Sequence, residues 1–518
     1  MLKAEPRQRD ASVLWVWLAD HGSALHAVAF ACILLVGVVL RFSYLGGRPF
    51  RFDEAVLYWI AQGDLLAILS LNAHWNSGPP LFAYLVAAAS RVDQSEAFVR
   101  SVPAIFGVLT VGAVYWAARA FSSPRWALVP MLLAAVAPPA VDISQYLREY
   151  SLSMLMSALL VGAAVRYIMH RRLSDGLLTV VIGAVSLHVQ YGLALLFAAV
   201  GLVWAGWSLV WLLRGPFPTR TVWLLGLLGV TGLVSAWLTW LLALHAQYAS
   251  DGFGSGHYLA SYYLEYGWRD APRFLVSRIS RLLATPFHAY EAPLLSSLIS
   301  TMIVAAGLVL GLLHSAARPL TILVLVAIAV TAAAALSQKY PLGPIRQDYF
   351  LVSLLFIVAP LVASYLHRTL RPLATSVALG VVSVLVGLQV IILVGRSIEI
   401  VTFQGLEDMP SVLRALEREQ ARTDVLIFDP VAVPLYAYYT DPRRPPEAGL
   451  AAIASEDTRA RHADMLAASL QGSGTVLILA VEWSWSGEQL ARMMPPARTL
   501  ELVAEGGWVR LHRSTVRA

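Results

Sequence analysis

Long runs of apolar residues, repeated along most of the chain, limit what this sequence can fold into. Each run of roughly 18 residues or more is long enough to cross a bilayer as a helix. The 518 residues are 58% hydrophobic and only 14% charged, whereas a soluble globular protein usually carries about 25% charged residues. This composition excludes a disordered chain and an ordinary soluble enzyme, and a single cysteine excludes a disulfide-stapled module. The sequence therefore predicts a polytopic α-helical membrane protein.

The apolar runs predict about eleven membrane-spanning helices within residues 1–396. We expect them near 26–45, 97–120, 126–141, 150–168, 176–190, 191–213, 222–245, 296–314, 319–337, 348–366 and 373–395. An odd number of spans places the N-terminus and the C-terminal region on opposite sides of the membrane.

Arginines in alternate short loops predict the orientation. The net charge is +6, and these loops share a side with the basic N-terminus, which the positive-inside rule makes cytoplasmic. The basic excess therefore needs no nucleic-acid partner. The other side carries the long loops 46–96 and 246–295. Arginine, alanine and leucine are abundant and lysines number two, which suggests a bacterium and hence its inner membrane.

Residues 397–518, which we call the tail, are more polar and predict a small extracytoplasmic α/β domain. The expected strands are Val425–Phe428, Thr475–Ala480 and a closing hairpin of Thr499–Val503 with Trp508–His512. The expected helices are Val433–Tyr439 and Leu490–Met494.

Two adjacent acids, Asp53 and Glu54, open the first long outer loop. They stand among the aromatic residues Phe50, Phe52, Tyr58 and Trp59. Such surroundings disfavour a charged carboxylate, so we expect raised pKa values that suit a general base. The alternative is a solvated charge pair at the membrane interface.

Later in the same loop, His74 precedes a turn at Pro79-Pro80. His74 could be a metal ligand, but no second histidine or cysteine lies at ligand spacing. The alternative is a histidine that forms hydrogen bonds at the membrane interface. Glu96 and Arg100 are four residues apart and are expected to pair on one helix face.

The order of short motifs resembles the glycosyltransferase C superfamily. Asp-Glu at 53–54 is followed by Pro-Pro-Leu at 79–81 and by Glu-x-x-x-Arg-x-x-Pro at 96–103. Gln145–Tyr150 resembles an Arg-x-Tyr stretch, and Tyr340–Arg346 a Pro-x-Gly-x-x-Arg segment. The likeness covers roughly residues 25–395 and is nearest to the branch of protein O-mannosyltransferases and lipid A aminoarabinose transferases.

The resemblance implies transfer of a sugar from a polyprenyl-phosphate donor to a lipid, glycan or protein acceptor on the outer face, with inversion. Asp53 would be the base that removes the acceptor proton. Glu54 would orient Asp53 or bind acceptor or metal. A divalent cation stays open, with Asp53, Glu54 and Asp142 as its candidate ligands. The tail would help to recognise the acceptor.

The phosphate leaving group needs cations, and Arg148, Lys339 and Arg346 stand in outer loops. For each of them, lipid headgroup binding is the alternative. Further substrate contacts are expected from His74, Tyr150, Tyr191 and His257. The alternative is that these side chains are solvated at the interface or hydrogen-bond to one another. The rival function is a transporter or flippase of lipid-linked sugars. A third possible function is a receptor that acts through its tail and has no catalytic activity. Charged residues gather at one face rather than at mid-membrane depth, which favours surface chemistry.

Overall fold

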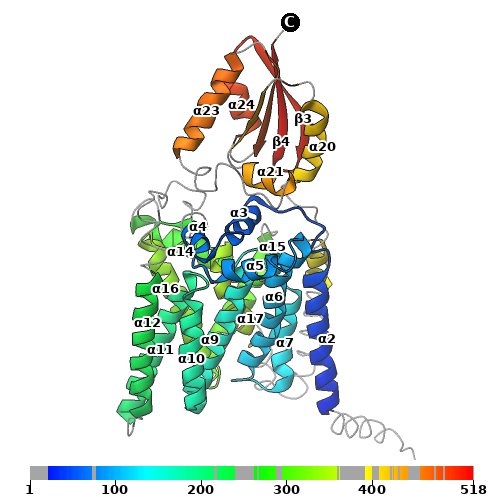
Figure 1. Cartoon of the computed structure of the whole chain (residues 1–518). Helices are drawn as coiled ribbons and strands as arrows, with labels where there is room; N and C mark the ends of the chain where they lie inside the picture. The colour runs from blue at the N-terminus through cyan, green and yellow to red at the C-terminus, as the bar shows by residue number, and fades with distance from the viewer. Residues whose placement is uncertain are drawn as a thin grey trace, which may run out of the picture.

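The computed structural model describes residues 22–72, 78–214, 219–239, 262–264, 268–287, 294–358, 361, 391–399, 408–420, 423, 425–429, 432–440, 456–471, 474–481 and 485–516. These residues form a bundle of helices with a small mixed sheet above one end (Figure 1). We call that end of the bundle the sheet end.

Five described helices are long and apolar enough to cross a membrane. They are α2 (Gly22–Phe42), α6 (Glu96–Ala118), α9 (Tyr150–His170), α11 (Gly192–Arg214) and α16 (Arg318–Leu336). Other described apolar helices lie in the same bundle: α10 (Leu173–Ser186), α12 (Thr219–Thr239), α15 (Leu294–Leu313) and α17 (Tyr349–Val358). Each overlaps a predicted span. The span predicted near 373–395 lies mostly outside the described residues, and the total of eleven stays a prediction.

The span predicted near 126–141 is broken into α7 (Pro124–Val136) and α8 (Pro138–Ser144), which meet at 56°. Pro138 and Pro139 lack amide protons, and the residue before a proline avoids helical geometry. The buried Arg41 side chain donates to the carbonyl oxygens of Ala134 (2.7 Å) and Ala135 (2.8 Å) at the break. A break inside a bilayer needs such partners, because no water is present to replace the lost bonds.

Three short helices from the first loop lie at the sheet end: α3 (Phe52–Ala61), α4 (Leu65–Leu71) and α5 (Leu81–Ser90). Asp53 and Glu54 occupy the first turn of α3, where the helix dipole favours negative charge. Asp64 caps α4 through two backbone amides. The proline pair directly precedes α5, as the sequence predicts.

Further along the chain, short elements connect the apolar helices. They are η4 (Trp268–Asp270), α14 (Ala271–Ala284), η5 (Thr285–Phe287) and η6 (Arg346–Asp348). The last of these leads directly into α17 and carries Arg346 at its start.

A four-stranded sheet in the order β1-β2-β4-β3 forms the centre of the tail. β1 (Val425–Phe428) runs parallel to β2 (Val476–Val481), whereas β4 (Val509–Val516) is antiparallel to both β2 and β3 (Arg498–Gly506). Around it lie α20 (Met409–Gln420), α21 (Val433–Thr440), α23 (Glu456–Gln471) and α24 (Gly487–Met493). The predicted strands and the closing hairpin are confirmed as elements.

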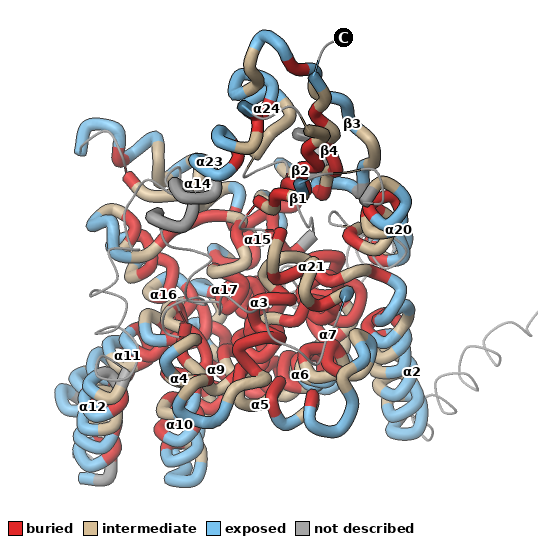
Figure 2. Tube along the Cα trace, turned by 45° about the horizontal axis from the view of Figure 1, so that its top comes forward, coloured by how far each residue is buried: buried red, intermediate tan, exposed pale blue. Residues whose placement is uncertain are grey.

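The two faces of this sheet have different partners. Side chains alternate along a strand, and Ile478 and Ala480 of β2 pack in a small separate core with Leu466 and Leu470 of α23. The opposite face, with Leu477 and Leu479, belongs to the same hydrophobic core as the helix bundle, together with parts of α20 and α21. Helix α21 lies between the sheet and the bundle (Figures 1 and 2).

Candidate active site

Glu54 is buried and fully bonded at the start of α3. Arg100 of α6 donates to both carboxylate oxygens, from Nε to Oε1 (2.8 Å) and from Nη2 to Oε2 (2.7 Å). The backbone amides of Arg51 and Leu147 add bonds of 2.9 Å each. Four donors match the roughly four lone-pair sites of a carboxylate. Burial would raise the pKa of Glu54, but Arg100 and these hydrogen bonds outweigh it, so the pKa is lowered. The geometry fits a residue that fixes the start of α3.

Asp53, one residue earlier, is accessible. Its side chain is 36% exposed, against 2% for that of Glu54. The Tyr146 hydroxyl donates to Oδ2 at 2.7 Å, and Nη1 of Arg346 lies 3.4 Å from the same oxygen. Arg346 also donates to the Tyr146 hydroxyl at 2.5 Å. The guanidinium groups of Arg51 and Arg346 lie over the Tyr146 ring, 5.0 and 4.9 Å from its centre. The Asp53 carboxylate is thus accessible and lies among positively charged guanidinium groups.

The expectation of a raised pKa is wrong for Asp53. Burial acts in the expected direction, but Arg346 and Arg148, together with the Tyr146 hydroxyl, outweigh it and lower the pKa. The aromatic context was visible in the sequence, whereas the guanidinium groups come from distant parts of the chain. Asp53 is therefore ionised without a bound ligand.

A tight turn presents Arg346 to Asp53. Gly343 has φ of 153°, and a Cβ there would lie 2.8 Å from a ring carbon of Tyr262. Its amide donates to the fully buried Asp348 at 2.7 Å, which closes the turn. Burial raises the pKa of Asp348 well above its ordinary value, and the Gly343 amide opposes this only in part. Asp348 thus holds the turn through the Gly343 amide, while Arg346 pairs with Asp53.

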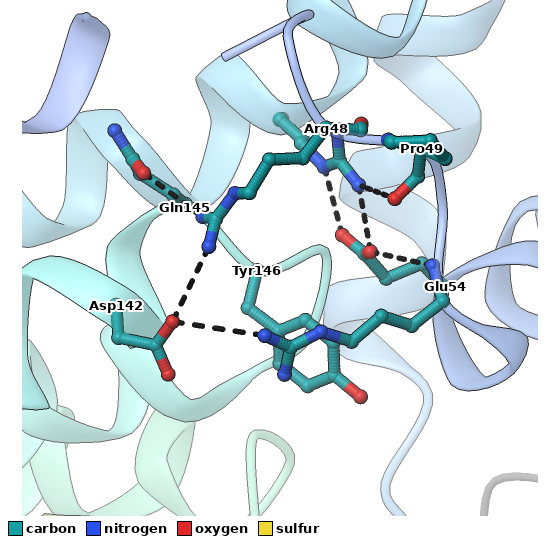
Figure 3. Close-up of a pocket in the computed structure, with 8 residues that line it drawn as sticks. Arg48, Pro49, Glu54, Asp142, Gln145 and Tyr146 are labelled. Carbon is teal, nitrogen blue, oxygen red and sulfur yellow. Dashed lines mark hydrogen bonds and ion pairs between the residues drawn. The ribbon is translucent and has the colours of Figure 1, made fainter. Parts of the chain in front are cut away.

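Asp142 belongs to a neighbouring group of charges, which shares Arg51 with the surroundings of Tyr146 and lines a cavity of about 10 Å³. Arg48 donates to Gln145 Oε1 at 2.9 Å and lies 3.5 Å from the Asp142 carboxylate, while Arg51 is 3.9 Å from it. Figure 3 shows the Arg48 guanidinium between Gln145 and Asp142.

The three carboxylates considered as metal ligands do not converge. Asp53, Glu54 and Asp142 each face a different arginine. Within the part of the chain that the structure describes, no group of three or more His, Cys, Asp or Glu could hold a metal ion. The arrangement of these carboxylates fits pairing with guanidinium groups rather than binding of a metal ion.

Two further predicted residues, Arg148 and Tyr150, lie close to the group of Asp53, Tyr146 and Arg346. The Arg148 Nε is 3.2 Å from Glu149, and the Arg148 guanidinium lies 5.7 Å from the centre of the Tyr150 ring. Tyr150 stacks on Tyr146, with ring centres 6.3 Å apart. Arg346 thus contacts Asp53 directly and Arg148 acts on its charge, whereas Tyr150 contacts Tyr146, the hydrogen-bond partner of Asp53.

The other predicted residues are less closely placed. Tyr191 precedes α11 in a turn whose Gln190 donates to the backbone of Gln347, next to Arg346. Lys339 is exposed just after α16, and its side chain makes no hydrogen bond or ion pair with Asp53, Tyr146 or Arg346. His74 and His257 lie outside the described residues.

Tyr146 is the main residue that the sequence did not single out. It stands inside the stretch Gln145–Tyr150, whose resemblance pointed to Arg148 and Tyr150. The available signal was its place in that stretch. Spacing alone gives no choice between Tyr146 and Tyr150, and only the fold shows which hydroxyl meets Asp53.

The predicted pairing of Glu96 with Arg100 is confirmed at 3.3 Å. Its meaning changes, however, because Arg100 makes two shorter bonds to Glu54. The Glu96–Arg100 pair therefore helps to hold the Arg100 side chain in place against Glu54.

Comparisons with known proteins agree with this fold. The family described as dolichyl-phosphate-mannose-protein mannosyltransferase matches residues 77–240. ArnT from Cupriavidus metallidurans in the apo state aligns with a TM-score of 0.53 at 12% identity, over 98% of this chain and 99% of ArnT. The archaeal oligosaccharyltransferase AglB from Archaeoglobus fulgidus, in complex with an inhibitory peptide and a dolichol-phosphate, aligns with a TM-score of 0.50 at 14% identity. That alignment covers 91% of this chain and 71% of AglB. No curated protein sequence matches significantly.

The chain thus shares its overall fold with ArnT and AglB. The family match covers residues 77–240, about a third of the chain, and the solved structures, at 12% and 14% identity, show a shared fold. The resemblance predicted from the motif order is confirmed as a likeness of fold and, over residues 77–240, as a match to the mannosyltransferase family.

Proposed function

We propose that this protein is a membrane glycosyltransferase that moves a monosaccharide from a polyprenyl-phosphate donor to a lipid, glycan or protein acceptor. The sheet end would face the extracytoplasmic side of a bacterial inner membrane. The observation that carries the proposal is the accessible Asp53 carboxylate, held beside Arg346 at the end of an apolar bundle. A lipid-linked phosphate arriving along the bundle and a hydroxyl arriving from water would meet there.

The reaction is a single displacement at the anomeric carbon. Asp53 accepts the proton of the acceptor hydroxyl while that oxygen forms a bond to the anomeric carbon. The bond from this carbon to the phosphate oxygen breaks, and its electron pair leaves with the polyprenyl phosphate. Arg346 and Arg148 stabilise the charge that develops on the phosphate. Attack from the face opposite the leaving group inverts the configuration.

The same arginines link donor binding to the strength of the base. Without ligand, Arg346 and Arg148 keep the pKa of Asp53 low, which makes the carboxylate a weak base. A bound phosphate brings negative charge to these guanidinium groups and reduces their effect on Asp53. The pKa of Asp53 then rises in the donor complex, where a stronger base is needed.

Replacing Arg346 tests this link through pH. Asp53 must be ionised, so kcat/KM falls as the pH drops through the Asp53 pKa, which Arg346 keeps low in the free enzyme. Arg346→Gln removes a positive charge, raises that pKa and moves the acid limb of the kcat/KM profile to higher pH. We also expect the rate to drop about 10- to 100-fold, since a hydrogen bond to a charged group is worth about 1.5–3 kcal/mol. The measurement is the pH profile of donor consumption.

Arg396→Gln is the matched control, because Arg396 forms an exposed ion pair with Glu399. It should leave both the rate and the profile unchanged. An acid limb that stays in place in Arg346→Gln would show that Arg346 does not act on the base.

The function itself is tested with purified protein in proteoliposomes and a panel of radiolabelled polyprenyl-phosphate monosaccharides, with envelope extract as acceptor source. The proposal expects free polyprenyl phosphate and label in an acceptor for at least one donor. Movement of intact donor between leaflets, without release of the carrier, would instead establish a flippase.

A further inference from the structure

The tail touches the helix that carries Asp53. Helix α21 packs directly against α3, although the two are more than 370 residues apart in the chain. Trp59 of α3 donates from its indole nitrogen to the backbone oxygen of Pro434 at 3.0 Å. In Figure 2, α21 and α3 lie together in the buried interior. The tail is therefore attached at the candidate active site.

Aromatic rings fill this contact. The Tyr438 ring lies 4.7 Å from that of Phe50 and 4.9 Å from that of Tyr58. Phe50 and Tyr58 are fully buried, and Tyr438 is 7% exposed. Ring pairs at these distances add specific geometry to the burial of apolar area. Phe50 and Tyr58 flank the first turn of α3, where Asp53 stands.

One hydroxyl in the contact has two polar partners. The backbone amide of Phe50 donates to the Tyr439 hydroxyl at 2.6 Å, and this hydroxyl donates to Oε1 of Glu96 at 2.6 Å. Burial, with Glu96 beside it, raises the pKa of the Tyr439 hydroxyl, so the proton stays available for donation. Each of the three groups comes from a different element of the fold.

Two short paths lead from Tyr439 to Asp53. The first runs along the backbone, since Phe50 is three residues before Asp53. The second runs through ion pairs, from Glu96 to Arg100 (3.3 Å) and from Arg100 to Glu54 (2.7 Å). Arg100 also donates to the carbonyl oxygens of Leu45 and Pro49, at 3.1 Å each. Both paths end at the segment that sets where the Asp53 carboxylate points.

We propose that Tyr439 of the tail is a positioning residue for the candidate active site, which holds the start of α3 so that Asp53 meets Tyr146 and Arg346. This inference rests on the proposed function. It gives the tail a task within the catalytic site itself, apart from any recognition of the acceptor. Tyr439 touches no reacting atom and acts through Phe50 and Glu96.

The test compares Tyr439→Phe with Tyr436→Phe. Tyr436 is on the same helix, and its ring packs on Phe428 within the tail, 4.6 Å away. Amide hydrogen exchange in detergent is measured first, because it needs no substrate. In Tyr439→Phe we expect faster exchange in residues 50–61 and unchanged exchange in α9 and β2, which report on overall folding. Tyr436→Phe should leave residues 50–61 as in the wild type.

Kinetics with the radiolabelled donor that the wild type consumes supply the second readout. For Tyr439→Phe we expect kcat to fall roughly 10-fold with little change in the donor KM, because a small misplacement of a reacting group is costly. We also expect the acid limb of the kcat/KM profile to move to higher pH, as Asp53 loses its fixed distance from Arg346. A general loss of stability would not move this limb.

Unchanged exchange in residues 50–61 together with wild-type kcat would overturn the positioning role. A raised acceptor KM with unchanged kcat and acid limb would also overturn it, and would assign Tyr439 to acceptor binding. If the wild type consumes no donor, the proposed function fails, whereas the exchange measurement still decides whether the tail holds α3.

Discussion

Asp53→Asn is expected to lower the turnover of donor by about 100- to 10,000-fold, which is the usual contribution of a positioned general base. The amide keeps the size of the side chain and offers an oxygen to the Tyr146 hydroxyl, but it does not accept the acceptor proton. Donor affinity should be kept or increased, since Arg346 loses its carboxylate partner. The measurement is initial release of polyprenyl phosphate at saturating donor, with binding followed separately by ligand-induced thermal shift.

Asp64→Asn is the control on the same loop. Asp64 caps α4 through the amides of Leu66 and Ala67, and asparagine is an equally good cap. This variant should transfer at the wild-type rate. Wild-type turnover in Asp53→Asn would remove Asp53 from the role of base.

Arg100→Gln is expected to cost about 3–5 kcal/mol of stability, because it leaves the buried Glu54 charge without its partner. The carbonyl oxygens of Leu45, Arg48 and Pro49 also lose a donor. The free energy is not easily measured for a membrane protein, so the midpoint of heat-induced loss of the monodisperse peak in detergent serves instead. We expect a clear drop of this midpoint together with loss of activity.

Two variants make this prediction specific. Arg119→Gln, at the other end of α6, removes a bond to the backbone of Ser122 and should change the midpoint little. The double variant Arg100→Gln with Glu54→Gln removes both charges and should recover part of the loss. If Arg100→Gln and Arg119→Gln had equal midpoints, the buried pair would not stabilise the first loop.

Much of the fold was readable from local patterns. Apolar runs, the proline pair before α5 and the strands of the tail are visible within a few neighbouring residues. The break between α7 and α8 was missed, although Pro138 and Pro139 announce it. The continuous apolar run across 126–141 suggested one unbroken span instead. The hydrogen bonds that stabilise the break come from Arg41 in a distant helix.

The site was predictable only in part. The resemblance indicated that Arg148, Lys339 and Arg346 share a site with Asp53. The structure brings Arg346, 293 residues away in the chain, and Arg148 to Asp53, but it does not bring Lys339 there. The direction of the Asp53 pKa was not predictable, because it depends on distances to arginines from other loops. The partner of α21 was equally hidden. Its helical pattern is local, but its contact with α3 is a property of the folded chain.

The anomeric configuration of the transferred sugar tests the central claim most directly. With the donor that the wild type consumes, the product is isolated and the coupling constant of its anomeric proton is compared with that of the donor. A single displacement assisted by Asp53 predicts inversion. Retention of configuration would contradict it and would require two displacements, with a covalent or otherwise shielded intermediate in place of a base-assisted attack.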